Sequence, residues 1–413
     1  MRIPILSIPV DLSLALLSCT KHWMTGATEP GVPHYYAGSE ILLFDTEELQ
    51  EAVVYAPYLP ALRRIILQLD ADDSKVPEAL HAFQQVTQLE IWGVGADCSL
   101  QALSKMPQLQ VLRIQSVFGR QNLNYITALK RLGELHLIGC RLANLPFEQS
   151  NWANLEVLDL SGNRFTLEYY VEELMQLSKL RALRMDGNPI EWLPHRLFEH
   201  QRLEYLSFDG CKIVGIKGDV GYNMVFKEIN LGNNFLSALP IESVDFPNLK
   251  RLSMPNNKIT ALPPIVVSNI KFMWVNFRKN GLKTLPKSWL EYPLLSYLDV
   301  GENEMDSLPT LGAQGSCIGY LNLDQNAFDR VPNCIVQMKE LNALSMWDNF
   351  TMQSIPLFVK NHSNLSQFEE KTNPYGFFAS ARTFDRADWK WQLLDSYSVL
   401  ASSPMHVFDL REK

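Results

Sequence analysis

One spacing recurs along this chain and limits how it can fold. The stretch LKRLSMPNNKITALP (249–263) places its apolar residues at intervals that fit neither a helix nor a strand. Related stretches begin at Leu155, Leu180, Phe226 and Leu295. Aligned on one Asn, successive repeats are 23 residues apart, except for a step of 25 from Asn163 to Asn188 and steps of 24 from Asp70 to Val94 and from Asn349 to Asn373. A period of this length indicates a tandem array in which each repeat buries its apolar side only against its neighbours.

The aligned position, called the anchor below, is Asn in most repeats. Its ten clearest members are Cys140, Asn163, Asn188, Cys211, Asn234, Asn257, Asn280, Asn303, Asn326 and Asn349. Asp70, Val94 and Val117 extend the column upstream and Asn373 extends it downstream, which gives fourteen units. An Asn amide both donates and accepts, so a buried anchor can satisfy backbone groups where the chain leaves a strand. We interpret the two Cys residues as small, buried, weak donors that replace Asn.

The pattern L-x-x-L-x-L-x-x-N-x-L-x-x-L-P resembles leucine-rich repeats. With its 23-residue step and Leu-Pro ending, as in Leu262-Pro263, it is most similar to Ras-suppressor and LAP-type scaffolds and to their bacterial counterparts. The resemblance covers residues 62–373. It implies an α/β fold: a horseshoe-shaped leucine-rich repeat solenoid with a parallel β-sheet on its concave face, about fourteen repeats and a cap at each end.

The N-terminal segment predicts a lipid anchor. Residues 1–19 contain a short apolar run that is typical of a signal peptide and ends in Leu16-Leu17-Ser18-Cys19. That ending is similar to the lipobox of bacterial lipoproteins, in which the Cys is lipidated, although Asp11 inside the apolar run departs from the pattern. The alternative is that residues 1–61 are simply the N-terminal cap of the array. The expected location is the bacterial envelope membrane if Cys19 is lipidated, and the cytoplasm otherwise.

Both ends of the array need a cap, because a terminal coil would otherwise expose its apolar end. Residues 20–61 are the expected N-terminal cap, with a strand over 41–44 and a helix capped by Asp45 or Thr46. Residues 374–413 lose the repeat and are the expected C-terminal cap, an irregular or helical lid.

Function is expected on the exposed face of the strands. The residues six, four and two positions before the anchor point outward, and equal positions in neighbouring strands form columns. The columns predict a patch of aromatic and Arg residues, the types that protein interfaces enrich. The candidate partner-binding residues are Tyr205, Arg251, Trp274, Arg278, Tyr297, Tyr320 and Trp347. Packing between neighbouring strands is the alternative reason for aromatic residues at these positions.

Catalytic and cofactor signals are weak. Asp186 and Asp209 share a column and could act as an acid pair or hold a cation, or could be ordinary charges beside Arg184. The His and Cys residues show no metal-ligand spacing, so neither a metal nor a cofactor is expected. The net charge of −8 and the lack of a basic stripe argue against a nucleic-acid partner.

Two classes of function remain at this stage. The first is a non-catalytic module that binds a protein, or alternatively a surface glycan, on its concave face, with contact to a membrane only through a lipid anchor. A cytoplasmic scaffold and a secreted effector are variants of this class. The second is an enzyme resembling the bacterial effector ubiquitin ligases. It is disfavoured because the 40 residues after Asn373 contain no Cys that could serve as the nucleophile.

Overall fold

The computed structural model describes residues 40–70, 73–93, 98–115, 123–146, 152–167, 170–218, 223–239, 246–265, 273–349, 355–370 and 377–380. It divides into two compact units, with the described residues up to Leu160 in the first and those from Ser161 in the second. Cys19, Val94, Val117 and Asn373, and almost all of the expected C-terminal cap, lie outside the described residues.

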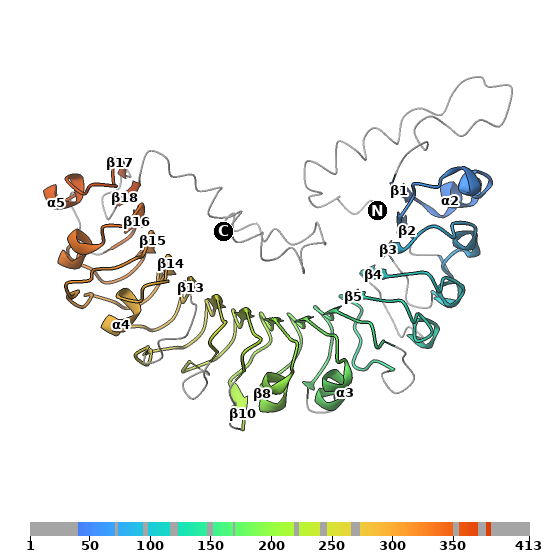
Figure 1. Cartoon of the computed structure of the whole chain (residues 1–413), viewed down its shortest axis with the longest axis horizontal. Helices are drawn as coiled ribbons and strands as arrows, with labels where there is room; N and C mark the ends of the chain where they lie inside the picture. Colours follow the sequence, from blue (N-terminus) through green and yellow to red (C-terminus); the bar gives the residue numbers. More distant parts are fainter. Residues whose placement is uncertain are drawn as a thin grey trace, which may run out of the picture. The chain divides into compact units, whose positions relative to one another are not determined.

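The first unit is a stack of parallel strands joined by short helical turns (Figure 1). Its strands pair in chain order: β1 (Ile41–Phe44), β2 (Arg64–Gln68), β3 (Gln88–Trp92), β4 (Val111–Gln115), β5 (Glu134–Ile138) and β6 (Val157–Asp159). Helix α2 (Thr46–Ala52) follows β1, and the other connections contain 3-10 turns at Val53–Tyr58, Glu78–Ala82, Gln101–Lys105 and Leu123–Ile126.

The first strand and helix form as the sequence predicts. Strand β1 pairs with β2, and Asp45 caps α2 by accepting a hydrogen bond from the Glu48 backbone N–H at 2.7 Å. The Glu48 carboxylate accepts the Asp45 N–H in return, which completes a capping box. The expected N-terminal cap therefore contributes a strand to the sheet of the first unit.

The second unit repeats the same arrangement with shorter strands. Its main sheet contains β7 (Ala182–Arg184), β9 (Tyr205–Ser207), β11 (Glu228–Asn230), β12 (Arg251–Ser253), β13 (Trp274–Asn276), β14 (Tyr297–Asp299), β15 (Tyr320–Asn322) and β16 (Ala343–Ser345), all parallel. A separate two-stranded sheet pairs β8 (Trp192–Pro194) with β10 (Gly215–Lys217). The helical connections are α3 (Val171–Gln176), α4 (Lys287–Leu290), α5 (Leu357–Lys360) and 3-10 turns at His195–Glu199 and Asn333–Gln337.

The last part of the sheet departs from the repeat. Strand β17 (Gln367–Glu370) belongs to the expected fourteenth unit, but it does not pair with β16. Strand β18 (Phe377–Ser380) lies between the two and runs antiparallel to both. The regular parallel stack of the second unit therefore ends at β16, one repeat earlier than the spacing predicts.

The core of each coil consists of the residues that alternate with the exposed ones. In the coil that begins at Leu249, the side chains of Leu249, Leu252, Met254 and Ile259 are buried, while Arg251 remains partly exposed. Because the strands are in register from β9 to β16, these apolar side chains stack on their counterparts in the coils above and below.

The anchor column supplies the hydrogen bonds that hold the coils together. The amide Nδ2 of Asn303 lies 3.0 Å from each of three carbonyl oxygens, those of Phe277, Val300 and Gly301, and its Oδ1 accepts the Leu282 N–H at 3.0 Å. The same pattern recurs at Asn257, Asn280 and Asn326. Each anchor therefore connects its own turn to the preceding coil.

Cysteine anchors keep only part of this pattern. The Cys211 thiol donates to the Met185 carbonyl at 3.1 Å, and the Cys140 thiol lies 3.4 Å from the Ile138 carbonyl. Burial raises the pKa of the Cys211 thiol to about 12, so it stays protonated and can donate. A thiol has no counterpart of the amide oxygen, which limits Cys to the donor half of the role.

Candidate functional site

Three aromatic side chains form a continuous stack on the exposed face of the second unit's sheet. Trp274, Tyr297 and Tyr320 occupy equal positions in β13, β14 and β15. The ring centroids of Trp274 and Tyr297 are 5.0 Å apart, and those of Tyr297 and Tyr320 are 4.5 Å apart with an interplanar angle of 2°. Parallel strands about 4.8 Å apart place equal positions close to the distance at which rings stack. We call these three residues the aromatic ladder.

Stacking fixes which parts of the ladder a ligand can reach. Both faces of the Tyr297 ring are covered, one by Trp274 and one by Tyr320, so a ligand can reach only the edge of this ring. Burial raises the pKa of Tyr297 well above its ordinary value, so its hydroxyl remains a neutral donor and acceptor. Among the described residues, the indole Nε1 of Trp274 has no hydrogen-bond partner. The ladder is thus a partly exposed aromatic surface, and the Trp274 Nε1 within it is buried.

Tyr205 and Arg251 belong to the same column but not to the ladder. Glu228 and Arg251 occupy the two strands between Tyr205 and Trp274. The Arg251 Nε lies 3.7 Å from the Glu228 Oε1, and Tyr205 is buried. The predicted patch is therefore interrupted by an ion pair, and its aromatic part contains three stacked rings.

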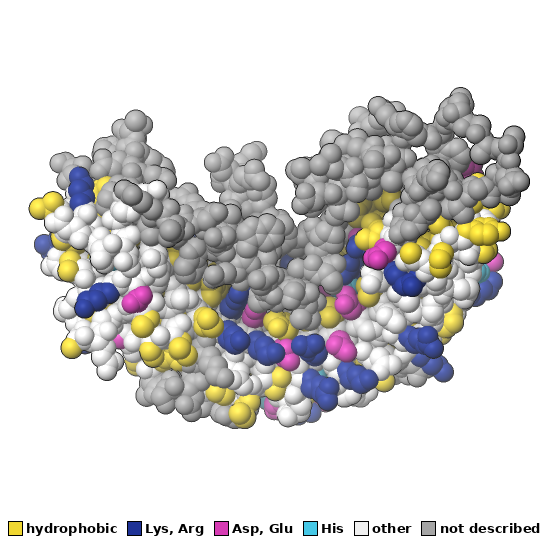
Figure 2. All heavy atoms as spheres, turned by 45° about the horizontal axis from the view of Figure 1, so that its top comes forward, with side chains coloured by type: hydrophobic (Ala, Val, Ile, Leu, Met, Phe, Trp, Pro, Cys, Tyr) yellow, Lys and Arg dark blue, Asp and Glu magenta, His cyan; other side chains and the backbone are white. Residues whose placement is uncertain are grey.

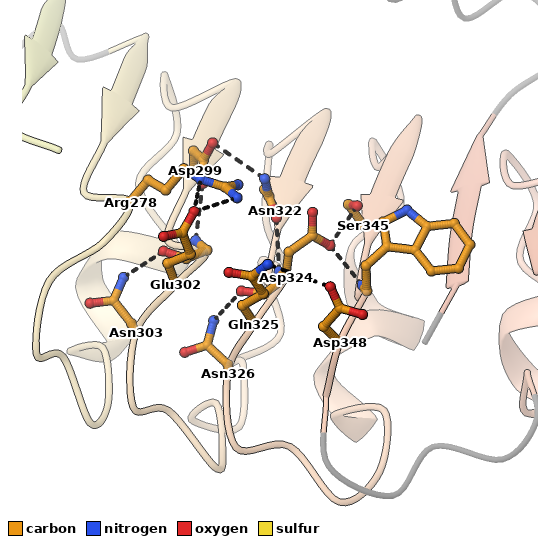
Figure 3. Close-up of polar contacts among 12 residues, drawn as sticks. Arg278, Asp299, Glu302, Asn303, Asn322, Asp324, Gln325, Asn326, Ser345 and Asp348 are labelled. Carbon is orange, nitrogen blue, oxygen red and sulfur yellow. Dashed lines mark hydrogen bonds and ion pairs between the residues drawn. The ribbon is translucent and has the colours of Figure 1, made fainter. Parts of the chain in front are cut away.

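Arg278 is engaged by carboxylates of its own chain (Figure 3). Its Nε donates to the Glu302 Oε1 at 2.9 Å, and its charge lies beside Asp299. Burial lowers the pKa of Arg278, but the nearby carboxylates outweigh this effect and the pKa is raised. A Cβ on Gly301 would lie 3.0 Å from the Arg278 guanidinium, so a small residue is needed there. Arg278 thus connects neighbouring repeats.

Two carboxylates in this region are buried or partly buried. Asp299 accepts the Gly301 N–H at 3.0 Å, and burial raises its pKa to about 6 although Arg278 opposes the shift. Asp324 accepts the Ser345 hydroxyl at 2.6 Å and the backbone N–H of Trp347 at 2.7 Å, and burial raises its pKa as well. Trp347 therefore lies beside Asp324, in a different column from the aromatic ladder.

The candidate acid pair is occupied by interactions within the chain. Asp186 accepts the Ser207 hydroxyl at 2.6 Å and the Asp209 N–H at 2.8 Å, and it pairs with the Arg184 guanidinium. The Asp209 carboxylate accepts the Asn233 amide at 2.8 Å. Asp186 is buried rather than solvated. Within the described part of the chain, no group of three His, Cys, Asp or Glu residues is arranged to hold a metal ion.

A row of polar side chains next to these columns was not anticipated from the sequence. The residues immediately before the anchors adopt a left-handed backbone conformation, with φ between +51° and +57°, in six successive repeats. We call them the strand-exit row: Asn233, Asn256, Lys279, Glu302, Gln325 and Asp348. The preceding repeats carry Gly139, Gly162, Gly187 and Gly210 at this position, also with positive φ. The change from Gly to polar residues is the sequence signal that could have identified the row.

Members of the strand-exit row contact each other and the columns. The Asn256 amide donates to the Asn233 Oδ1 at 2.7 Å, and the Gln325 amide lies 3.4 Å from the Asp348 Oδ2. In Figure 3, Glu302, Gln325 and Asp348 follow one another along the ends of neighbouring strands. The row therefore extends the polar surface beyond the strands themselves.

The first unit carries a charged row of its own. Glu90 pairs with Arg64, and its other oxygen accepts the indole N–H of Trp92 at 2.8 Å. Arg113 pairs with Glu134 at 3.4 Å. Counting six and four residues back from each anchor would have identified these positions. Because the charges pair among themselves, the row offers no net charge to a ligand.

Comparisons with known proteins agree with this architecture. The family model described as Leucine Rich Repeat matches residues 154–174. A solved leucine-rich repeat protein of Leptospira interrogans superimposes with a TM-score of 0.58 at 20% identity, covering 77% of this chain and 91% of that one. The Toll–Spätzle complex of Drosophila gives a TM-score of 0.59 at 20% identity, covering 79% of this chain and 46% of the other. The chain therefore has a leucine-rich repeat fold.

Curated relatives resemble only part of this chain. The volume-regulated anion channel subunit LRRC8E of Xenopus tropicalis is 28% identical over 184 residues, which cover 37% of this chain and 22% of that protein. The same subunit from Xenopus laevis matches equally. The chain thus spans less than a quarter of these relatives. No helix within the described residues has the length and hydrophobicity needed to cross a membrane.

Charge on the leucine-rich repeat surface is mixed. On the face that Figure 2 displays, Lys and Arg side chains are interspersed with Asp and Glu side chains over the described residues. Such a distribution does not form the continuous basic stripe that a phosphate backbone requires. Leucine-rich repeat folds are typically non-catalytic and bind other proteins.

Proposed function

We propose that this chain is a non-catalytic binding module whose partner is another protein. The partner contacts the aromatic ladder and the polar columns beside it, over β13–β16. The observation that carries the proposal is the register of Trp274, Tyr297 and Tyr320, which gathers three large side chains on one exposed face. Aromatic side chains dominate binding energies because they bury a large area and lose few rotamers.

Other ligands fit this face less well. A sugar ring packs on an open aromatic face, and both faces of the Tyr297 ring are occupied by its neighbours. The buried carboxylates of Asp186, Asp299 and Asp324 are satisfied by hydrogen bonds within the chain, which favours a structural role over acid–base chemistry. The Toll–Spätzle neighbour is a complex between proteins, in keeping with a protein ligand.

The test is a binding comparison with a matched variant. A chain carrying Trp274→Ala, Tyr297→Ala and Tyr320→Ala, called the ladder variant below, should lose partner binding by about a hundredfold or more. The control is Phe235→Ala, because Phe235 is an exposed aromatic outside the ladder whose ring packs against Lys258. The readout is retention of one identified partner by wild type and control but not by the ladder variant. Equal retention by all three, with unchanged circular dichroism, would contradict the proposal.

We further propose that Cys19 tethers the module to a bacterial membrane. The support is the sequence Leu16-Leu17-Ser18-Cys19, which lies outside the described residues. Metabolic labelling with a clickable fatty acid should mark the wild-type chain and not Cys19→Ser. An unlabelled wild type that retains Met1 would instead indicate a cytoplasmic scaffold.

A further inference from the structure

The surface beside the aromatic ladder carries more negative than positive charge. The outward positions of β13–β16 and the strand-exit row after them hold four carboxylates, the buried Asp299 with Glu302, Asp324 and Asp348, and two cations, Arg278 and Lys279. The formal charge of this set at neutral pH is therefore −2. The Arg278 guanidinium is already committed to Asp299 and Glu302.

Among the described residues, neither Asp324 nor Asp348 forms an ion pair, although the charge of Arg278 acts on Asp324 and opposes the rise of its pKa. Asp324 is held by the Ser345 hydroxyl and the Trp347 N–H, and Asp348 by the Gln325 amide. These donors are neutral, so they orient the carboxylates without cancelling their charge. Asp348 is exposed and Asp324 is half-buried, which leaves both within reach of a bound molecule.

The strand-exit row runs alongside the ladder strands and extends beyond them at both ends. Polar residues with positive φ replace Gly at this position from Asn233 to Asp348, and the ladder strands β13–β15 lie inside that interval. Gly adopts this conformation without steric cost and Asn and Asp tolerate it, whereas Lys279, Glu302 and Gln325 are strained in it. Retention of side chains in a strained position indicates that the side chains themselves are used.

We propose that the ladder face binds a basic protein segment. Its Lys or Arg residues lie against Glu302, Asp324 and Asp348, and its apolar side chains cover the partly exposed rings of Trp274, Tyr297 and Tyr320. This inference rests on the proposed function and specifies the charge of the partner. Opposite charges steer association and select among partners, while the buried aromatic area supplies most of the affinity.

The experiment uses the full chain and two synthetic peptides. One peptide alternates Lys with Leu, and the other carries Glu in place of every Lys. Isothermal titration calorimetry at low and at high salt should show binding of the Lys peptide only, weakened by salt as screening predicts. The variant Glu302→Gly with Asp348→Gly should bind the Lys peptide about tenfold more weakly. Circular dichroism should show an unchanged fold, because Gly relieves the strained backbone and so offsets the loss of the ion pair between Arg278 and Glu302.

Two controls separate charge at the site from net charge and from the backbone change. Glu47→Gln with Glu51→Gln removes two exposed carboxylates from α2 in the first unit. Asn233→Gly makes the same backbone change in the strand-exit row before β12, outside the ladder strands. Both should bind the Lys peptide as wild type does.

The outcomes distinguish the two proposals. Lys-peptide binding that is lost in the ladder variant and weakened about tenfold in the Glu302/Asp348 variant supports both. Equal binding of the two peptides, no binding of either, or full binding by the Glu302/Asp348 variant overturns the basic-partner inference. In those cases the proposed function is still decided by whether the ladder variant retains its protein partner. Equal weakening by the α2 control would also overturn the inference, since attraction would then depend only on net charge.

Discussion

Each anchor asparagine satisfies backbone groups that the short strands leave unpaired. The anchor amide of one repeat reaches carbonyls of its own turn and of the coil before it, as at Asn303. The sequence was sufficient to predict this column, because only a residue that both donates and accepts can serve every group in the turn. Cys140 and Cys211 show that the donor half alone is tolerated.

Replacement of one anchor should therefore cost more than replacement of a cysteine. We expect Asn303→Ala to lower the free energy of unfolding by about 3 kcal/mol, because buried backbone groups lose their partners. Cys211→Ala, which removes only a weak thiol donor, should cost about 1 kcal/mol. Urea denaturation followed by circular dichroism measures both values, and equal losses would show that the amide acceptor contributes little.

Other residue-level features could not be read from the sequence. Lys279, Glu302 and Gln325 belong to residue types that do not favour positive φ, so only their alignment with the Gly residues of earlier repeats could have indicated the strand-exit row. Arg278 was predicted to bind a partner, and that role stays a prediction. Its pairing with Glu302 depends on side-chain rotamers that the repeat spacing does not determine.

Among the elements, the strands were the most predictable. The constant step places Trp274, Tyr297 and Tyr320 in register, and the exposed column follows from strand alternation. The position of β18 was not predictable, because its antiparallel pairing with β16 and β17 depends on a reversal of the chain after the last repeat. The prediction of a fourteenth repeat was wrong in one respect, because its strand, β17, does not continue the parallel stack.

The free energy of unfolding of the chain should depend on pH through Asp299, the last residue of β14. The Asp299 carboxyl has a pKa of about 6 in the folded state because of burial, above its ordinary value of 3.8. The folded chain thus holds this proton to a higher pH than the unfolded chain, and the associated stability is lost as pH rises through about 6. Asp299→Asn should raise the free energy of unfolding by about 1 to 2 kcal/mol at pH 7 and leave it nearly unchanged at pH 4. A gain of the same size at both pH values would exclude ionisation as its cause.

At the scale of the whole molecule, a substitution that destabilises one repeat should affect mainly that repeat and its neighbours. Each repeat contacts its neighbours, so stability is close to a sum of repeat and interface terms. Hydrogen exchange measured by mass spectrometry should show that Asn303→Ala loses protection over β13–β16 and keeps it over β2–β5. A uniform loss across both units would indicate a single cooperative transition instead.

The predictions made for the whole chain also include some that the sequence supports well and some that stay untested. The array and its fold class could be predicted because one period repeats through most of the chain. The signal peptide and the lipid anchor at Cys19 fall outside the described residues and stay predictions. A repeat pattern encodes packing between neighbours, whereas the identity of a ligand depends on exposed residues that the pattern leaves free.

The 23-residue register has a consequence for how such a surface can evolve. Duplication of one repeat would insert one strand, one anchor and one position in every exposed column, and the hydrogen bonds of the flanking coils would keep their form. Point substitutions in the strand-exit row would then change the new positions one at a time without touching the core. Lengthening the surface and changing its specificity are separate genetic events in this architecture, so selection can act on each alone.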